Sequence, residues 1–257
     1  MKKFLIVSAT LLAASSALAS TLRVGATPVP HAEILEVVKP LLAKQGITLE
    51  VREFTDYVQP NLALADKSLD ANFFQHVPYL DEFQKNRPLN LVSVGQVHVE
   101  PIGVYSRKLK KLSQIKNGAT IAIPNDPSNS GRALKLLERA GLVKLNPKAG
   151  IKATVLDITF NPRKLKFREL EAAQLPRVLA DVDAAVINTN YALEADLNPV
   201  KDSLFLEGKS SPYANILTVR AADRNNPDIL KLVKALQSPE VKAFIRKKYA
   251  GAVVPAF

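Results

Sequence analysis

The sequence predicts an α/β fold in one large or two small domains. From residue 21 onward, short strand-like runs alternate repeatedly with helix-like runs. The chain has 257 residues, of which 47% are apolar, so it can bury a sizeable core. It contains no cysteine, which excludes disulfides, thiolate metal sites, iron–sulfur clusters and cysteine nucleophiles. Folding is therefore expected to depend on the core alone.

Residues 1–19 are predicted to be a secretory signal peptide. Two lysines precede an apolar run over residues 4–14, and a small-x-small cleavage site ends at Ala19. A membrane anchor would need roughly 20 apolar residues, whereas two serines interrupt this run. We expect a mature chain that starts near Ser20 and is secreted across the inner membrane to the periplasm or cell envelope. Loss of the two lysines takes its formal charge from +11 to +9.

The N-terminal half is predicted to alternate strand and helix. Residues 22–26 and 47–54 have strand patterns, and residues 31–46 between them place five apolar side chains on one helical face. Pro40 is expected to bend or break that helix, because proline lacks a backbone N–H. The remaining elements are a helix at 60–69, a short strand at 70–74 and an extended stretch at 91–105 that Pro101 and Gly103 interrupt.

The C-terminal half continues the alternation. A strand at 120–123 runs into a loop at 124–128 with several possible N-caps, and a helix at 131–140 follows, stopped by Gly141. Basic and apolar residues alternate over 164–170, the pattern of a strand with one solvated face. The other predicted elements are strands at 154–159, 184–188 and 215–220 and helices at 172–180, 227–237 and 239–249.

The positive charge does not by itself indicate a nucleic-acid partner. The basic residues gather at 107–116 and 163–168, in stretches expected to form solvated surface, and a secretory signal argues against such a partner. The sequence has no Gly-x-Ser-x-Gly elbow, no His-Glu-x-x-His and no Gly-rich phosphate loop. We therefore expect a binding protein without a cofactor and not an enzyme. A secreted enzyme with paired carboxylates stays open as an alternative.

Two segments at predicted strand ends can supply an aromatic wall to a pocket. Phe74, His76 and Tyr79 follow one another where a strand passes into a helix, and Tyr57 lies in the loop after the preceding strand. Rings at such positions can wall a pocket and also form hydrogen bonds. In the alternative interpretation, the phenylalanine belongs to the core and His76 caps the helix.

The segment 125–132 has the features of an anion site. It places free backbone N–H groups at a helix start, with Arg132 one turn further on. A guanidinium fork can hold a carboxylate through two hydrogen bonds, so the segment suits a small ligand that bears a carboxylate or a phosphate. In the alternative, Arg132 pairs with Glu138, Asp126 or another acid of the chain.

Two asparagines next to apolar strands can complete a polar site. Asn190 follows the strand at 184–188, and Asn215 begins the strand at 215–220. An amide both donates and accepts hydrogen bonds, which suits a zwitterionic ligand. Asparagine at a strand end is also a common turn residue, and this interpretation stays open.

The three histidines support a competing hypothesis, a metal site. His98 and Glu100 lie two residues apart on one strand face, and histidine with carboxylate is a donor set for zinc or manganese. The spacing of His31, His76 and His98 matches no tight ligand motif. A zinc or manganese carrier that uses these histidines is therefore an alternative to a carrier of small organic molecules.

A secreted chain of this length with alternating strands and helices fits a two-lobed binding protein, whose ligand lies where strand ends of both lobes meet. Several motifs then carry a closer resemblance, in the order FTDYVQPNLAL at 54–64, DANFFQHVPYL at 70–80, PNDPSNSGRAL at 124–134, INTNY at 187–191 and SPYAN at 211–215. On these motifs, the chain from about Leu22 to its C-terminus resembles the methionine-binding lipoproteins of the NlpA/MetQ type, the substrate-binding components of ABC importers.

The resemblance implies a type II periplasmic-binding-protein fold, in which two α/β lobes are joined by two crossovers around a ligand cleft. Residues 20–104 and 207–257 would form lobe 1 and residues 105–206 lobe 2. Arg132 would hold the α-carboxylate of a free amino acid, with Asn190 and Asn215 orienting its amino and carboxylate groups. The residues expected around the side chain are Tyr57, Phe74, His76 and Tyr79, and Glu100 lies near the cleft at the first crossover.

The ligand that the resemblance implies is L-methionine, captured by lobe closure and delivered to a membrane permease with its ATPase. A monomer that meets the membrane through the permease is expected. A thioether against aromatic rings gains only ~0.3–1.5 kcal/mol, so a different apolar amino acid or a short methionine peptide stays open. The family usually carries a lipid-bearing cysteine after its signal peptide, whereas this chain has no cysteine, and a lipid anchor is not carried over.

Overall fold

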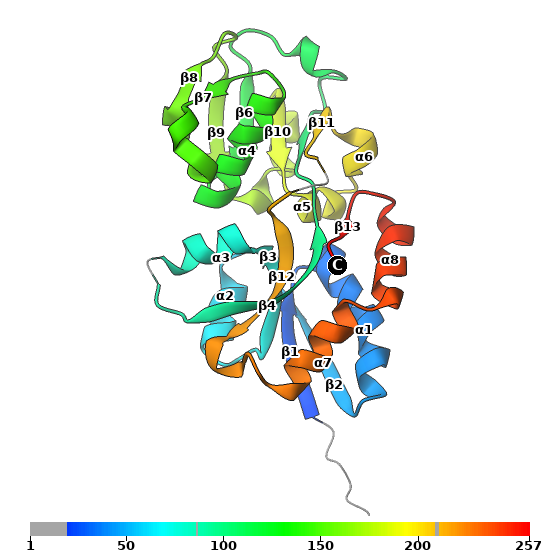
Figure 1. Ribbon diagram of the computed structural model, residues 1–257. Coiled ribbons are helices and arrows are strands. Elements are labelled where there is room, and N and C mark those ends of the chain that lie inside the picture. Colours follow the sequence, from blue (N-terminus) through cyan, green and yellow to red (C-terminus); the bar gives the residue numbers. More distant parts are fainter. Residues whose placement is uncertain (1–19, 86, 209–210) are drawn as a thin grey trace, which may run out of the picture.

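The computed structural model describes residues 20–85, 87–208 and 211–257, which form two α/β lobes stacked one above the other (Figure 1). Each lobe has a sheet of its own, and short connections join the two. The α/β fold predicted from the sequence is confirmed. The predicted signal peptide at 1–19 lies outside the described residues.

Lobe 1 is built on a six-stranded sheet in the order β13-β4-β12-β3-β1-β2. β1 pairs in parallel with β2 and β3, while β12 runs antiparallel between β3 and β4. The strands are β1 (Ser20–Ala26), β2 (Ile47–Glu53), β3 (Ala71–His76), β4 (Leu91–Val99), β12 (Ala214–Arg220) and β13 (Val254–Pro255).

Helices cover both faces of this sheet. α1 (Glu33–Ala43), α7 (Pro227–Leu236) and α8 (Pro239–Tyr249) share one apolar core with the sheet, in which Leu35 and Leu236 are fully buried. α2 (Gln59–Ala65) and α3 (Val77–Gln84) pack on a second cluster with Ile216 of β12. Burial of these faces is the main favourable contribution to the stability of the lobe.

Lobe 2 is built on a five-stranded sheet in the order β11-β5-β10-β6-β9. Its strands are β5 (Gly103–Tyr105), β6 (Thr120–Pro124), β9 (Lys166–Leu170), β10 (Ala184–Ile187) and β11 (Phe205–Leu206). Besides several short 3₁₀ turns, lobe 2 contains α4 (Pro127–Arg139), α5 (Thr189–Glu194), α6 (Pro199–Asp202) and a small antiparallel pair of strands, β7 (Lys144–Leu145) and β8 (Ile158–Phe160).

Two connections pass between the lobes. β4 of lobe 1 leads through residues 100–102 directly into β5 of lobe 2, and the chain returns from β11 to β12 through residues 207–213. The first connection is only three residues long, so residues near Glu100 sit where the two lobes meet. The C-terminal strand β13 then pairs with β4.

Several sequence predictions differ from the structure in detail. The strand predicted at 154–159 is a short 3₁₀ turn at Val155–Asp157 followed by the three-residue strand β8 at Ile158–Phe160. Pro40 does not break α1, because the buried apolar face of the helix holds the turn in spite of the missing N–H. α4 begins at Pro127, four residues earlier than predicted, since Asp126 caps it. The helix predicted at 172–180 is two separate turns, Ala172–Gln174 and Arg177–Ala180, because Pro176 between them cannot continue a helix.

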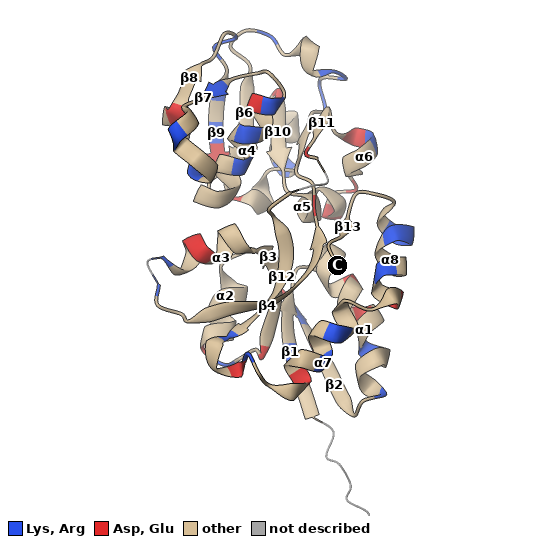
Figure 2. Cartoon of the chain, viewed as in Figure 1, with Lys and Arg blue, Asp and Glu red and all other residues tan. Residues whose placement is uncertain are grey.

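The charge of the chain is spread over its surface. On the face seen in Figure 2, Lys and Arg occur on both lobes with acidic residues among them, and they do not merge into one continuous patch. None of the helices in the part of the chain that the structure describes is long and apolar enough to cross a membrane.

Candidate functional site

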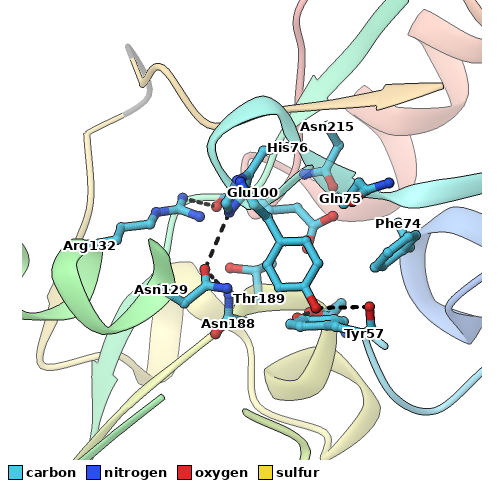
Figure 3. Close-up of a pocket in the computed structure, with 12 residues that line it drawn as sticks. Tyr57, Phe74, Gln75, His76, Glu100, Asn129, Arg132, Asn188, Thr189 and Asn215 are labelled. Atoms are coloured by element: carbon cyan, nitrogen blue, oxygen red, sulfur yellow. Dashed lines mark hydrogen bonds between the residues drawn. The ribbon is translucent and has the colours of Figure 1, made fainter. Parts of the chain in front are cut away.

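A cavity between the lobes collects all of the predicted ligand-binding residues (Figure 3). Lobe 1 supplies the loop after β2, the end of β3, the start of α3 and the start of β12, and lobe 2 supplies the N-terminal ends of α4 and α5. The twelve lining residues are Tyr57, Phe74, Gln75, His76, Tyr79, Glu100, Asn129, Arg132, Asn188, Thr189, Asn190 and Asn215.

The pairing of strands in lobe 1 explains why its residues converge. Asn215 at the start of β12 lies opposite His76 on one side and opposite His98 on the other. All six residues of β3 are buried, so its last residues point into protein on both faces of the sheet. His76 also caps α3, since its Nδ1 accepts a hydrogen bond of 3.2 Å from the backbone N–H of Tyr79. His76 therefore both caps α3 and lines the cavity.

Aromatic rings form one wall of the cavity. The ring centroids of Tyr57 and Phe74 lie 5.9 Å apart, those of Tyr57 and Tyr79 5.7 Å, and those of Phe74 and Tyr79 6.0 Å. These spacings are those of favourable aromatic pairs. Burial raises the pKa of the Tyr57 and Tyr79 hydroxyls, and burial and the charge of Arg132 lower the pKa of His76 to about 3. This wall is therefore neutral at physiological pH and suits an apolar group.

Arg132 lies opposite this wall, and two of its three guanidinium nitrogens already form hydrogen bonds with other residues of the protein. Its Nε donates to Glu207 Oε1 at 3.1 Å, and its Nη2 donates to the Glu100 carbonyl oxygen at 2.7 Å and to Glu207 Oε2. The guanidinium also stacks on the ring of Tyr213, 4.3 Å from its centroid. Arg132 therefore pairs with an acidic residue, the alternative that the sequence left open, and its partner is Glu207. Nη1 has no hydrogen bond to the described residues.

The N-terminus of α4 places Arg132 by two local devices. The carboxylate of Asp126 accepts a hydrogen bond of 2.9 Å from the backbone N–H of Asn129, which closes the first turn. Gly131 lets the segment at 147–152 approach the helix, because a Cβ there would lie 2.2 Å from the carbonyl oxygen of Ile151. Both residues belong to the motif from which the sequence predicted an anion site.

Amide side chains fill the floor of the cavity, and two of their atoms are unpaired. Asn188 Nδ2 donates to Asn129 Oδ1 at 2.9 Å, and Asn190 Oδ1 accepts from the Tyr57 hydroxyl at 2.6 Å. Among the described residues, Asn190 Nδ2 and Asn188 Oδ1 are buried without any hydrogen-bond partner. Buried polar atoms are nearly always paired, so an unpaired donor and acceptor in one cavity indicate a polar ligand.

Hydrogen bonds across the cavity hold the lobes together. Besides the Tyr57–Asn190 bond, the Tyr191 hydroxyl donates to the Thr55 carbonyl oxygen at 3.1 Å, and His76 Nε2 lies 3.3 Å from Asn129 Oδ1. Arg132 and Asn190 are only 4% and 2% exposed. The structure is therefore a closed arrangement, in which a ligand would contact both lobes at once.

The three histidines do not form one group. Among the described residues, the cluster of possible metal ligands consists of His31, His98 and Glu100, whose ligand atoms lie within 4.8 Å of one another. His76 is engaged elsewhere, with Asn129. The three histidines that the metal hypothesis takes as ligands therefore do not lie together: His31 and His98 lie near Glu100, and His76 lies apart from them.

Sequence reasoning missed several residues of the cavity. Asn129, Asn188 and Thr189 all stand within motifs that carried the resemblance, so an amide or hydroxyl inside those motifs was the available signal. Gln75 is also in such a motif, next to His76. Glu207 carried no signal, because its role depends on Arg132, 75 residues earlier in the chain.

Comparison with known proteins decides the family. A family model described as NlpA lipoprotein matches residues 22–257. The chain belongs to the NlpA lipoprotein family. This confirms the resemblance predicted from the sequence motifs, and the two lobes with two crossovers are those of the type II periplasmic-binding-protein fold.

Individual members of the NlpA lipoprotein family are similar over nearly the whole chain. The methionine-binding lipoprotein MetQ of Bacillus subtilis is 44% identical over 237 residues, 90% of this chain and 86% of the relative. The D-methionine-binding lipoprotein MetQ of Escherichia coli K12 is 44% identical over 236 residues, 91% and 87% of the two chains. A nutrient binding protein from Burkholderia cenocepacia, solved bound to methionine, is 55% identical with a TM-score of 0.90, over 92% of this chain and 100% of that chain.

Proposed function

We propose that this protein is the substrate-binding protein of an ABC importer and that it captures a free amino acid with an apolar side chain, L-methionine in the first place. The lobes close around the amino acid, and the closed form delivers it to a membrane permease with its ATPase. The protein acts as a secreted monomer and binds its ligand without catalysis.

One observation carries the proposal: unpaired polar groups stand beside a neutral aromatic wall in a closed cavity. Arg132 and Asn190 line the cavity and carry N–H donors with the chemistry to hold an α-carboxylate, and Asn190 Nδ2 is unpaired among the described residues. Tyr57, Phe74 and Tyr79 offer ring faces and edges to a side chain, and a thioether packs well against such rings. An amino acid with an apolar side chain fits this arrangement, with its polar head group at the donors and its side chain against the aromatic rings.

The relatives support methionine as the ligand without deciding its stereochemistry. The Burkholderia cenocepacia protein was solved with methionine, while the Escherichia coli relative is named for D-methionine. L- and D-methionine carry the same four groups on Cα and differ only in their arrangement, so the same donors can bind the carboxylate of either enantiomer. Which enantiomer is preferred therefore depends on the packing around Cα. We infer a preference for L-methionine as the hypothesis to test.

Closure and affinity are coupled in the proposed mechanism. Arg132 and Asn190 belong to lobe 2, while Tyr57, Phe74 and Tyr79 belong to lobe 1. A ligand that contacts both sets binds better in the closed form, and this difference in affinity shifts the equilibrium toward closure. We place the hinge motion at the two crossovers between the lobes.

Thermal unfolding of the ligand-stripped mature chain tests the function. The protein is unfolded, dialysed, refolded and scanned with L-methionine, D-methionine, leucine, glycyl-methionine or zinc. A ligand at 100 times its Kd adds ~2.7 kcal/mol of stability. A shift with L-methionine above all others supports the proposal, a larger shift with leucine or the peptide changes the substrate, and a response to zinc alone refutes an amino-acid carrier.

A matched pair of variants tests the site. Arg132→Ala removes the donor to the carboxylate, whereas Arg139→Ala removes an exposed arginine from the far end of the same helix. We expect the first variant to lose methionine binding and the second to keep it. Unchanged affinity in Arg132→Ala would show that the carboxylate is held elsewhere.

A further inference from the structure

One ion pair joins the two lobes outside the ligand cavity. Lys152 Nζ of lobe 2 pairs with Glu82 Oε2 of lobe 1. Among the ion pairs of the described residues, it is the one that joins the lobes away from their two connections, since the pair of Arg132 and Glu207 lies on the second connection. Neither Lys152 nor Glu82 is among the twelve residues that line the ligand cavity. The pair therefore contacts the other lobe and not the ligand.

Glu82 is held in place by lobe 1. It lies on α3 between Tyr79 and Phe83, whose rings are buried and stack with their centroids 5.9 Å apart. α3 lies beside α4 of the other lobe (Figure 1). The side chain of Glu82 is 17% exposed, and Lys85 Nζ on the same helix lies 3.9 Å from its other oxygen, Oε1. Lobe 1 by itself thus supplies one cation to this carboxylate, at the limit of an ion-pair distance.

Lys152 is held in place by lobe 2. It is the last residue of the turn Pro147–Lys152, and the next residue, Ala153, is buried in the apolar core of that lobe. The turn packs closely against α4 because Gly131 has no side chain to keep it away. The side chain of Lys152 is 52% exposed and reaches from this fixed backbone to α3. Formation of the ion pair therefore depends on how near the two lobes are.

In the closed arrangement, the Glu82 carboxylate depends on Lys152. Glu82 Oε2 is buried and, among the described residues, has no hydrogen-bond partner besides its ion pair with Lys152. The ammonium group of Lys152 lowers the pKa of Glu82, so the carboxylate is ionised at physiological pH. When the lobes separate, the lysine moves away with lobe 2 and water reaches the oxygen. Because a buried anion without a partner is costly, loss of the lysine destabilises the closed form more than the open form.

The ion pair adjoins a groove beside the ligand cavity. The groove has a volume of about 260 Å³, and residues of both lobes line it, among them Tyr79 and Glu82 of lobe 1 and Asp126 and Ser128 of lobe 2. Tyr79 lines both the groove and the ligand cavity. The pair thus spans the lobes close to the ligand, with the ring of Tyr79 between them.

We propose that Lys152 and Glu82 form an electrostatic latch, an ion pair that is made only when the lobes close and that prolongs the time for which the closed form holds its ligand. Since neither residue lines the cavity, the latch acts by stabilising the closed form. The half-exposed lysine makes the latch sensitive to salt, which screens exposed charges. This inference rests on the proposed function, because it presupposes that the lobes close around an amino acid.

An exchange of the two charges tests the latch. Ligand-stripped wild type, Lys152→Glu, Glu82→Lys and the double exchange are titrated with L-methionine in a calorimeter, and the release of radiolabelled L-methionine into excess unlabelled ligand is timed. An exposed ion pair changes an equilibrium by about 1.4- to 5-fold, and two like charges oppose it by a similar factor. Each single variant should therefore bind about 2- to 30-fold more weakly through faster release, and the double exchange should return to within about 2-fold of the wild type.

Matched controls separate the ion pair from general effects of charge. Lys148→Glu makes the same change on an exposed lysine of the same turn, and it should bind like the wild type. Glu82→Lys brings a second cation near Lys85, but this repulsion acts in the open and the closed form alike and leaves the affinity unchanged. Lys152→Met should bind about 1.4- to 5-fold more weakly. An increase in NaCl from about 20 mM to about 500 mM should weaken binding more in the wild type than in Lys152→Met.

The outcomes separate this inference from the proposed function. A wild type that binds no amino acid refutes the proposed function, and the latch with it. If L-methionine binds and the double exchange is no tighter than the weaker single variant, the latch is wrong and the proposed function stands. Slower capture in place of faster release would also overturn the latch, since the pair would then act before closure. Lower unfolding midpoints of the ligand-stripped single variants with unchanged affinity would show that the pair supports the fold alone.

Discussion

The buried ion pair between Arg132 and Glu207 allows a prediction that separates folding from binding. Their side chains are 3% and 5% exposed. Arg132→Met removes the guanidinium with little loss of volume and leaves the Glu207 carboxylate with two long contacts, the Ile102 N–H at 3.4 Å and the Ser211 hydroxyl at 3.5 Å. A buried carboxylate without its cation is strongly destabilising, and the cost is expected to be about 3–5 kcal/mol.

The double variant reverses most of this loss. Arg132→Met combined with Glu207→Leu replaces both charges by apolar groups, and such a replacement is often close to neutral. For a chain of this size, each kcal/mol moves the unfolding midpoint by about 2–4 °C, so the single variant should lose about 6–20 °C. The double variant should unfold close to the wild type.

The single and the double variant should differ in stability but not in their affinity for methionine. Both variants lack Nη1 of Arg132, so both should lose about 2–5 kcal/mol of binding free energy, roughly a 30- to 5,000-fold weaker affinity. Thermal unfolding of ligand-stripped protein gives the stability, and calorimetric titration gives the affinity. Lys39→Met, which breaks an exposed ion pair on α1, is the control and should change neither.

Two results would refute this argument. A single variant as stable as the wild type would mean that Glu207 does not depend on Arg132, because water or a rearranged backbone satisfies its charge. A stable double variant that binds methionine normally would mean that the amino-acid carboxylate is held by other groups. In that case the assignment of Arg132 as the anion-binding residue would be wrong.

Three further predictions concern single residues. Tyr57→Phe deletes the hydroxyl that donates to Asn190 Oδ1 at 2.6 Å across the lobes, and it should weaken methionine binding by about 2- to 12-fold in calorimetry, the value of one hydrogen bond. Gly131→Ala would place a Cβ 2.2 Å from the Ile151 carbonyl oxygen and should cost about 1–3 kcal/mol in urea unfolding. Burial lowers the pKa of His76 to about 3. Above pH 6.5 the ring is neutral in both the folded and the unfolded chain, whereas between pH 6.5 and pH 3 only the unfolded chain takes up the proton, so the free energy of unfolding falls as the pH is lowered through this range. His76→Gln should therefore lose about 2 kcal/mol less than the wild type between pH 7 and pH 5, and an equal loss in both proteins would contradict the assignment.

The sequence by itself determined the class of fold and the identity of most site residues. Alternating strand and helix patterns are local properties, and so is the capping of α4 by Asp126, which depends on a carboxylate three residues before the N–H it accepts. The motifs also contained Tyr57 and Arg132, and the structure brings both to one cavity. The ligand role of these residues stays a prediction, because contact with a ligand is not a property of the chain alone.

Tertiary structure decided how those residues are used. The register of β12 between β3 and β4 places Asn215 opposite His76 and His98, and no local pattern encodes a register between strands over 100 residues apart. Glu207 reaches Arg132 only because it lies on the second connection between the lobes, which the fold brings beside α4. Local periodicity reports which face of an element is buried, whereas the partner of a buried charge depends on elements that the chain brings together from a distance.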